Sequence, residues 1–549
     1  MADASFDAVI VGGGTKSIVT AIYLAKYGGM SVGVFEERRE LCSGLTSEIG
    51  YVPGFVADCH ATSLCDWYYL PVIEGFPNWE RNGGKLFHLT GSAGIISVDD
   101  QSCWVLYSHE KDPTRELTAK GLAEFSSQRD ADTFMKLWKA VGKGSRFEQA
   151  FLDEIYNPPV PPGVPSPIEK WTMEYLAQPD CLVDYSFLDL PTIYAMQRIW
   201  ERKAVVYMFA RLSLFGGALL ETTPGFGYMM LGNQPWDWGH AVGGTHSIAH
   251  AYQRTLFEVG GKWFPFSKVE KIIIENGTAR GIQLADGTQV EAKKLVVSGV
   301  SPYQLCCEMI GPEHLGTKIT KKVESLIADI KGLAWYGWFM NDLPNYYAAD
   351  MNPDINKTTH LVLGSDDLTT LYNVHHHMRL GNPGSLKGRM MLFPYSAVDK
   401  TRAPIGKNVV GMDADLPTNT QLSEKEWLRL KRTFAEDAIK EWQRYAPNMT
   451  WDNIIGYHPE TPYDSARRGL NFWPHGNAGI IDIYPGQLGK VGPIPEMAQY
   501  RLPGIKNLYH CGSWRFPSGG NCCQGYVCYK VIAGDMELKK PWEDKGRSY

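Results

Sequence analysis

The sequence lacks any long hydrophobic run. No uninterrupted apolar stretch in its 549 residues approaches the roughly 18–20 residues that a membrane-spanning helix needs. The first predicted strand begins within the first few residues, which leaves no room for a signal peptide. We therefore expect a cytoplasmic protein with, at most, peripheral membrane contact, for which the aromatic-rich segment 186–238 is the best candidate.

A strong excess of charge of either sign is also absent. The 54 basic and 60 acidic residues give a formal net charge of −6. Proteins that bind nucleic acid carry basic surfaces, so we expect no nucleic-acid partner. A hydrophobic content of 44% with 21% charged residues is ordinary for a globular enzyme, and the length predicts two or more connected domains.

Paired cysteines with the spacing of a zinc site are missing as well. The 11 cysteines are scattered and odd in number, which favours reduced thiols over a disulfide framework. The run His375, His376 and His377 would place its first and third rings on one face of a strand, as a metal site requires. No acidic or cysteine cluster accompanies this run, so we expect no bound metal.

The N-terminus does contain a strand, a glycine turn, a helix and a second strand. Apolar residues 8–11 lead into the glycines 12–14, and apolar side chains then recur at helical spacing over 16–26. A second apolar run, 32–35, ends at the acidic residue Glu36. This order predicts a dinucleotide-binding βαβ unit within a Rossmann-like α/β fold.

Each residue type in that unit suits a dinucleotide. Gly12 permits the tight turn, and Gly14 lets the backbone approach a pyrophosphate at the helix N-terminus, where free N–H groups favour an anion. Glu36 can accept hydrogen bonds from the adenosine ribose, whereas NADP would require a cation, so FAD or NAD is favoured. Ser17 replaces the usual third glycine and is small enough to keep helix and strand close. A turn without a ligand would leave Glu36 without a role.

A second glycine-rich segment lies near the other end of the chain. Residues 504–512 read as a turn and a buried strand, and Gly519 and Gly520 precede a helix over about 523–536. FAD is extended and needs a backbone-donor site at each end, whereas NAD alone would need only the first. No second complete Rossmann fingerprint appears, so the expected cofactor is FAD without a stably bound NAD(P)H.

Together these motifs resemble the phytoene desaturase and carotenoid isomerase branch of the FAD-dependent amine oxidase superfamily. The resemblance extends over most of the chain in order and is weak over 80–240 and 306–450. Cys59 stands where the family usually has glycine, and Ser513 replaces the commoner acidic or alanine residue. Four segments carry the similarity: 7–36, 54–60, 243–302 and 508–520.

The resemblance implies a GR2-type FAD-binding domain and an interleaved α+β substrate-binding or cap domain. The first would be discontinuous, built from 1–75, 240–305 and 490–549, and the second would comprise 76–239 and 306–489. The C-terminal motif would hold the ribityl chain and the edge of the isoalloxazine ring, and the backbone at position 269 would meet the adenine. The predicted cofactor-binding residues are Gly12, Gly14, Thr15, Lys16, Glu36, Glu37, Arg38, Ser43, Gly44, Val269, Gly512, Ser513, Gly519, Gly520 and Gln524.

Candidate catalytic residues flank the segments that would touch the flavin. They are His60, Tyr526 and Cys523, and a packed core side chain is the alternative for each. In enzymes of this kind the flavin performs the hydride chemistry while the protein positions the substrate.

The resemblance implies an FAD-dependent oxidoreductase, a desaturase or dehydrogenase that acts on a small hydrophobic substrate, unsaturated or terpenoid-like. One alternative is an FAD-containing isomerase, hydratase or lyase with no net redox change. Another is a non-enzymatic prenyl-binding relative similar to the Rab GDP-dissociation inhibitors, which lack an intact glycine fingerprint. The electron acceptor, whether a quinone, oxygen or another oxidant, stays open, as does the oligomeric state.

Overall fold

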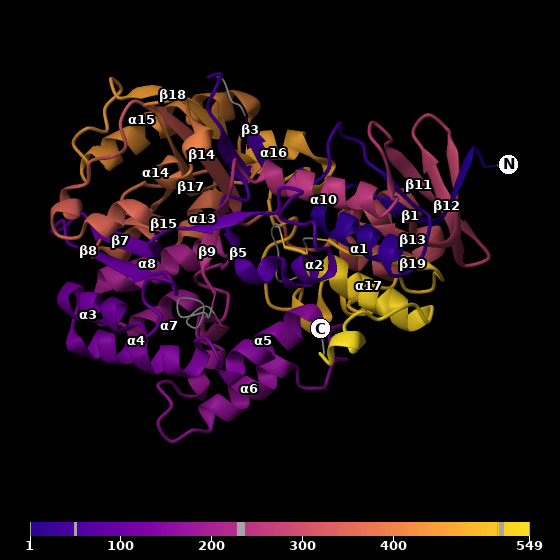
Figure 1. The fold of residues 1–549 in the computed structure, drawn as a ribbon, viewed down its shortest axis with the longest axis horizontal. Helices are drawn as coiled ribbons and strands as arrows, with labels where there is room; N and C mark the ends of the chain where they lie inside the picture. Colours follow the sequence, from indigo (N-terminus) through magenta and orange to yellow (C-terminus); the bar gives the residue numbers. More distant parts are fainter. Residues whose placement is uncertain (1, 49–51, 228–235, 513, 515–520, 548–549) are drawn as a thin grey trace.

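The computed structural model describes residues 2–48, 52–227, 236–512, 514 and 521–547. Two 7-stranded sheets organise the chain, one around the N-terminal βαβ unit and one on the opposite side of the molecule (Figure 1). The predicted α/β class, a Rossmann-like parallel sheet with a separate mixed sheet, is confirmed. No helix in the described part of the chain is both long and apolar enough to cross a bilayer.

The first sheet has the order β10-β2-β1-β13-β12-β11, and β19 pairs with the end of β13. Five of its strands run parallel, while β11 and β12 pair antiparallel with their neighbours. The carboxyl ends of the parallel strands therefore meet at one edge, where open α/β sheets bind ligands. Its strands are β1 (Ala4–Val11), β2 (Val32–Phe35), β10 (Lys262–Phe264), β11 (Val269–Glu275), β12 (Thr278–Leu284), β13 (Gln289–Ser298) and β19 (Leu508–His510).

Segments far apart in sequence thus share this sheet. Its strands lie within the three pieces predicted for the cofactor domain, although the domain boundaries themselves stay a prediction. Three helices pack beside it: α1 (Thr15–Lys26), α10 (His246–Glu258) and α17 (Cys523–Asp535).

Ser17 explains how α1 lies so close to β13 without the usual glycine. Residue 299, directly after β13, is a glycine, and a Cβ added there would lie 1.7 Å from Ser17 Oγ. The small residue required at this contact is therefore supplied by the strand side. The chain keeps the close packing by pairing a serine with Gly299.

The second sheet has the order β18-β14-β17-β16-β15-β7-β8. It alternates buried aliphatic and aromatic residues around its own core, which includes Trp338 and Trp442. Its strands are β7 (Gly91–Ser97), β8 (Cys103–Tyr107), β14 (Gly332–Met340), β15 (Thr358–Gly364), β16 (Met390–Phe393), β17 (Asn408–Leu416) and β18 (Ile454–Glu460).

Helices cover this sheet and extend below it (Figure 1). The helices predicted near 131–141 and 424–445 are present as α4 and α15. The longer helices are α3 (Glu116–Phe125), α4 (Gln128–Val141), α5 (Arg146–Tyr156), α6 (Pro167–Leu176), α7 (Thr192–Ile199), α8 (Lys203–Phe215), α12 (Thr317–Glu324) and α15 (Glu424–Gln443), and the shorter ones are α2 (Leu70–Gly75), α11 (Pro312–Leu315), α13 (Val374–Arg379), α14 (Tyr395–Val398) and α16 (Pro462–Arg468).

The strand placement considered for the histidine run is wrong. His375 to His377 lie in the helix α13, where Val374, His375 and Met378 face the core and the next two histidines are exposed. Residues two apart on a helix do not share a face, so the first and third rings are not paired.

A small hairpin joins the two sheets. It consists of β3 (Leu45–Glu48) and β4 (Ala57–His60), and a Cβ added to Gly337 of β14 would lie 2.3 Å from Ala57 Cβ. Asp58 of β4 accepts a hydrogen bond from the N–H of Thr245 at 2.8 Å and is ion-paired with the fully buried Arg402 at 2.7 Å. These contacts hold β4 between the cofactor edge of the first sheet and the second sheet. A further short sheet comprises β5 (Leu64–Cys65), β6 (Leu86–His88) and β9 (Trp238–Ala241).

Candidate functional site

The glycine turn after β1 forms an open cradle at the start of α1. Gly12 has a φ of +81°, a conformation that favours glycine, and its N–H donates to the carbonyl of Phe35 at 2.9 Å. Gly14 is the N-cap of α1, where no side chain caps the helix, and a Cβ placed on it would have no atom within 4 Å. Uncapped N–H groups facing open space fit a phosphate anion.

Glu36 follows β2 at the same edge and is held by two backbone donors. One carboxylate oxygen accepts from the N–H of Gly13 at 2.6 Å, and the other accepts from the N–H of Arg38 at 2.8 Å. Burial raises the pKa of Glu36, while these two N–H groups favour its ionised form. The carboxylate is thus fixed beside the glycine turn, within the reach that a ribose hydroxyl would require.

The segment before β11 lies alongside Glu36. The N–H of Ser267 donates to the Glu36 carbonyl at 2.8 Å, and the N–H of Phe266 donates to the Arg38 carbonyl at 3.3 Å. These bonds bring Val269, buried at the start of β11, to the acidic end of the predicted site. Glu37 is exposed in the same turn.

The loop that contains Ser43 and Gly44 runs between the glycine turn and β4. The N–H of Cys42 donates to the Gly13 carbonyl at 2.8 Å, and the N–H of Ala61 donates to the Gly44 carbonyl at 3.3 Å. The structure therefore brings this loop to the cofactor edge, as the sequence predicts.

The C-terminal motif arrives at this edge from β19. The N–H of Cys511 donates to the carbonyl of Ser298 at 2.8 Å, and Gly512 follows. α17 then packs on the first turn of α1, since a Cβ added to Gly525 would lie 2.2 Å from the Lys16 carbonyl oxygen. Gln524 is buried at the start of α17. Of the predicted residues in this motif, Ser513, Gly519 and Gly520 lie outside the described residues.

His60, the last residue of β4, sits in a buried aromatic setting. Its φ of +76° is unusual for a side chain other than glycine and marks a strained position. The ring stacks on Phe472 with centroids 5.1 Å apart and lies 4.8 Å from the ring of Trp335. Burial lowers the pKa of His60, and the neighbouring Glu460 offsets part of this effect. A neutral imidazole is therefore favoured.

The short helix that carries Phe472 is anchored to the end of β13. Asn471 accepts a hydrogen bond from the N–H of Ser301 at 2.7 Å, and its own amide donates to the Gly299 carbonyl at 3.4 Å. Because this helix covers the carboxyl edge of the first sheet, the His60 ring lies near the edge at which the glycine turn and Glu36 meet.

Glu460, at the end of β18, is a residue that sequence reasoning missed. Its side chain lies 3.5 Å from His60 Nε2 and receives two hydrogen bonds from Arg468 of α16, at 2.9 and 2.8 Å. Burial opposes ionisation of Glu460, yet hydrogen bonds from the histidines and from Arg468 hold its pKa well below the usual range. Arg38 donates in turn to the Arg468 carbonyl, which links this array to the predicted adenosine end.

Cys59, His458 and Glu460 form a group of metal-ligand type, with ligand atoms all within 4.8 Å of one another. Arg468 already donates to both Glu460 oxygens. A cation held in this way competes with a metal for the same carboxylate, so the ion pair accounts for the geometry. We therefore treat the group as part of the His60 array.

The other two catalytic candidates lie elsewhere. Tyr526 packs edge-on against Tyr23 of α1, with ring centroids 5.1 Å apart. Burial raises the pKa of Cys523 well above its ordinary value, which keeps the thiol protonated. Among the described residues no hydrogen bond, ion pair or ring contact joins either one to His60.

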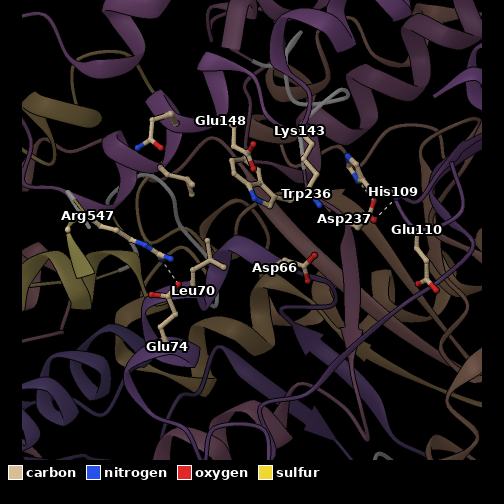
Figure 2. A pocket seen from close by; sticks show the side chains of 13 residues that line it. Asp66, Leu70, Glu74, His109, Glu110, Lys143, Glu148, Trp236, Asp237 and Arg547 are labelled. Atoms are coloured by element: carbon tan, nitrogen blue, oxygen red, sulfur yellow. Dashed lines mark hydrogen bonds and ion pairs between the residues drawn. The ribbon is translucent and has the colours of Figure 1, made fainter. Parts of the chain in front are cut away.

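A pocket of about 890 Å³ opens between α2, α5 and the C-terminal segment (Figure 2). Its wall is largely charged: Arg547 pairs with Glu74 at 2.5 Å, and His109 pairs with Asp237 at 2.9 Å. Leu70 is one of its few apolar neighbours. Such a lining does not suit the apolar substrate that the sequence predicts.

The fold and the cradle define a class: the chain has the mixed α/β architecture of the FAD-dependent amine oxidase superfamily. A solved structure of a putrescine oxidase variant matches with a TM-score of 0.56 at 12% identity, covering 97% of this chain and 99% of the other. Identity at this level establishes the fold alone. No protein-family model matches the chain.

Sequence relationships give the more particular placement. The chain is 24% identical to pyridine nucleotide-disulfide oxidoreductase domain-containing protein 2 of Rattus norvegicus, over 94% of this chain and 91% of the relative. It is 23% identical to a limonene dehydrogenase subunit of Castellaniella defragrans, over 98% and 96%. Prolycopene isomerase of Daucus carota is 22% identical over 55% of this chain and 45% of its own length. The chain is thus a distant homologue of limonene dehydrogenase, prolycopene isomerases and phytoene desaturases, within the FAD-dependent oxidoreductase superfamily.

Proposed function

We propose that this protein is an FAD-dependent desaturase or dehydrogenase of a hydrophobic, unsaturated, terpenoid-like substrate. The observation that carries the proposal is the similarity to the limonene dehydrogenase subunit along 98% of this chain. Limonene, phytoene and prolycopene, named for the relatives, are all unsaturated terpenoid hydrocarbons. The residues present fit FAD, because an open glycine cradle, an oriented carboxylate at Glu36 and a C-terminal helix start meet at one sheet edge.

In this proposal the cofactor is held from both ends. The N–H groups at the start of α1 bind the diphosphate, Glu36 binds the ribose, and the backbone near Val269 lies against the adenine. The start of α17 faces the ring end. The bound flavin supplies a hydride acceptor.

His60 and Glu460 supply the proton chemistry of the proposal. Removing two hydrogens from neighbouring carbons releases one proton for each hydride, and a neutral imidazole can accept that proton. Glu460 lies 3.5 Å from His60 Nε2 and stabilises the imidazolium that results. Arg468 keeps Glu460 ionised and oriented, so it acts as a positioning residue. The rings of Phe472 and Trp335 exclude water from this side of the site.

A flavin-dependent isomerase is the second candidate, favoured by the similarity to prolycopene isomerases over 55% of the chain. The same His60 could donate and accept a proton without net oxidation. Mass spectrometry of the product separates the two reactions. A dehydrogenase yields a product lighter by two hydrogen atoms and consumes an added electron acceptor, whereas an isomerase yields a product of unchanged mass.

The test uses the purified protein with limonene, acyclic terpenoids and carotenoid precursors, each with and without an artificial quinone acceptor. The proposal expects acceptor-dependent loss of two hydrogens from at least one unsaturated terpenoid. Turnover confined to polar amines, or no flavin in the protein at all, would contradict it.

A further inference from the structure

Lys16 is a cation enclosed in the protein interior beside the glycine cradle. It occupies the second position of α1, directly after the turn at 12–14, and only 2% of the residue is exposed. Gly525 of α17 packs against its carbonyl oxygen from the other side. The side chain is therefore confined between the first turn of α1 and the start of α17.

The groups that dominate its electrostatic environment are thiols. Burial lowers the pKa of Lys16 to about 8, and the thiols of Cys523, Cys522, Cys511 and Cys42 oppose this effect. Burial raises the pKa of Cys42 to about 12 and that of Cys523 well above its ordinary value, so both remain neutral at physiological pH. An anion brought close to a buried ammonium ion stabilises its charged form.

We propose that Lys16 is the buried counter-charge for the diphosphate of the bound dinucleotide, so that dinucleotide binding is coupled to protonation of this side chain. The proposal rests on the FAD binding proposed above. It adds a positive charge to the backbone N–H groups of the cradle, and it explains why a lysine is kept in an apolar helix packing position.

The coupling predicts how FAD affinity depends on pH. Below pH 8 the side chain is charged before FAD binds, and affinity is at its maximum. Above pH 8 binding must take up a proton, so affinity falls as pH rises. With a starting pKa of about 8, FAD should bind about tenfold more weakly at pH 9 than at pH 7.

The experiment is equilibrium dialysis of the holoenzyme against FAD between pH 6.5 and 9.5, with bound FAD read by absorbance. Lys16→Met should bind FAD ten- to hundredfold more weakly at pH 7, since a charge-assisted contact is lost, and should show no loss between pH 7 and 9. Lys16→Arg keeps its charge throughout this range, so it should bind FAD with a flat pH profile. Lys26→Met, at the exposed end of the same helix, is the matched control and should behave as wild type.

Cys511 requires its own control because it is the thiol near Lys16 that can ionise in this range. Burial raises the pKa of Cys511, but hydrogen bonds with Cys528 and Thr20 outweigh burial, and its pKa is lowered overall. Cys511→Ser should leave the fall in affinity between pH 7 and 9 intact. If the fall disappears in Cys511→Ser and persists in Lys16→Arg, the counter-charge is not Lys16.

Failure of this inference is distinguishable from failure of the proposed function. A wild-type protein that binds no FAD would overturn the proposed function. A wild-type protein that binds FAD with the same affinity at pH 7 and 9, or a Lys16→Met protein with wild-type affinity at pH 7, would overturn only the role of Lys16.

Discussion

Replacing Glu460 with glutamine tests the buried array beneath His60. The amide keeps the shape of the side chain but removes its charge, so Arg468 loses its counter-ion and His60 loses its anionic neighbour. Both side chains of the ion pair are well enclosed, with exposures of 3% for Glu460 and 13% for Arg468. Breaking a buried pair by neutralising one partner costs about 3–5 kcal/mol, and the amide retains one acceptor, so we expect about 3 kcal/mol.

The sign of the pH dependence follows from the lowered pKa of Glu460. A carboxyl group with a depressed folded-state pKa stabilises the protein above its unfolded pKa, and that stability is lost as pH falls through the folded value. Wild type should therefore lose part of its unfolding free energy below about pH 4.5. Glu460→Gln should lack this part at every pH.

A double-mutant cycle with Arg468→Met isolates the pair from other effects of the substitutions. Urea unfolding followed by fluorescence should show the double variant less destabilised than the sum of the single variants, by about 2 kcal/mol or more. Additive losses, together with an unchanged stability profile between pH 4 and 7, would refute the reasoning.

The same variant should change the acid limb of turnover. Glu460, Arg468 and Arg38 are the charged groups that face His60, and Glu460 raises its pKa while the two arginines lower it. Without the carboxylate the pKa of His60 falls further, so the acid limb of kcat/KM should move to lower pH in Glu460→Gln. A limb at the wild-type position would show that His60 does not carry the titration.

Two further substitutions address the cofactor edge. Glu36→Ala should weaken FAD binding ten- to hundredfold because a charge-assisted hydrogen bond to the ribose, worth about 1.5–3 kcal/mol, is lost; the exposed neighbour variant Glu37→Ala should not, and equal FAD contents after dialysis of the two would sink the ribose assignment. Gly299→Ala should lower the yield of folded, FAD-containing protein because its Cβ would lie 1.7 Å from Ser17 Oγ, and adding Ser17→Gly should restore it; a single Gly299→Ala variant with normal FAD content would show that the contact is not required.

Local patterns predicted the cofactor edge well. The apolar run 8–11, the glycine turn and the helical spacing of 16–26 are each contained within a few residues, so periodicity and turn chemistry identify them. The strands at 269–275, 278–284 and 289–298 alternate clearly for the same reason and lie close to their predicted bounds.

The His60 array could not be predicted in this way. His60 and Glu460 meet only because β4 packs against β14, whose edge pairs with β18. The pattern after Glu460 pointed to Asp464 and Arg468 as ion-pairing residues, but it carries no signal for a partner four hundred residues earlier in the chain. Asp58 and Arg402 are a second pair of this kind.

The histidine run shows a different limit. Three histidines between apolar residues are too short a stretch for period 2 and period 3.6 to be told apart. The burial of Val374, His375 and Met378 against the core decides for a helix, and this packing is not visible in the sequence.

The central claim, that the protein binds FAD and transfers hydride from an unsaturated hydrocarbon to it, is tested most directly by one measurement. Purified protein is mixed anaerobically with limonene or a carotenoid precursor, and its flavin absorbance is followed. The account predicts a yellow protein whose flavin band is bleached by at least one such hydrocarbon, and much more slowly in His60→Ala at equal FAD content. A colourless protein, or a flavin that no hydrocarbon reduces but a polar amine does, would contradict it.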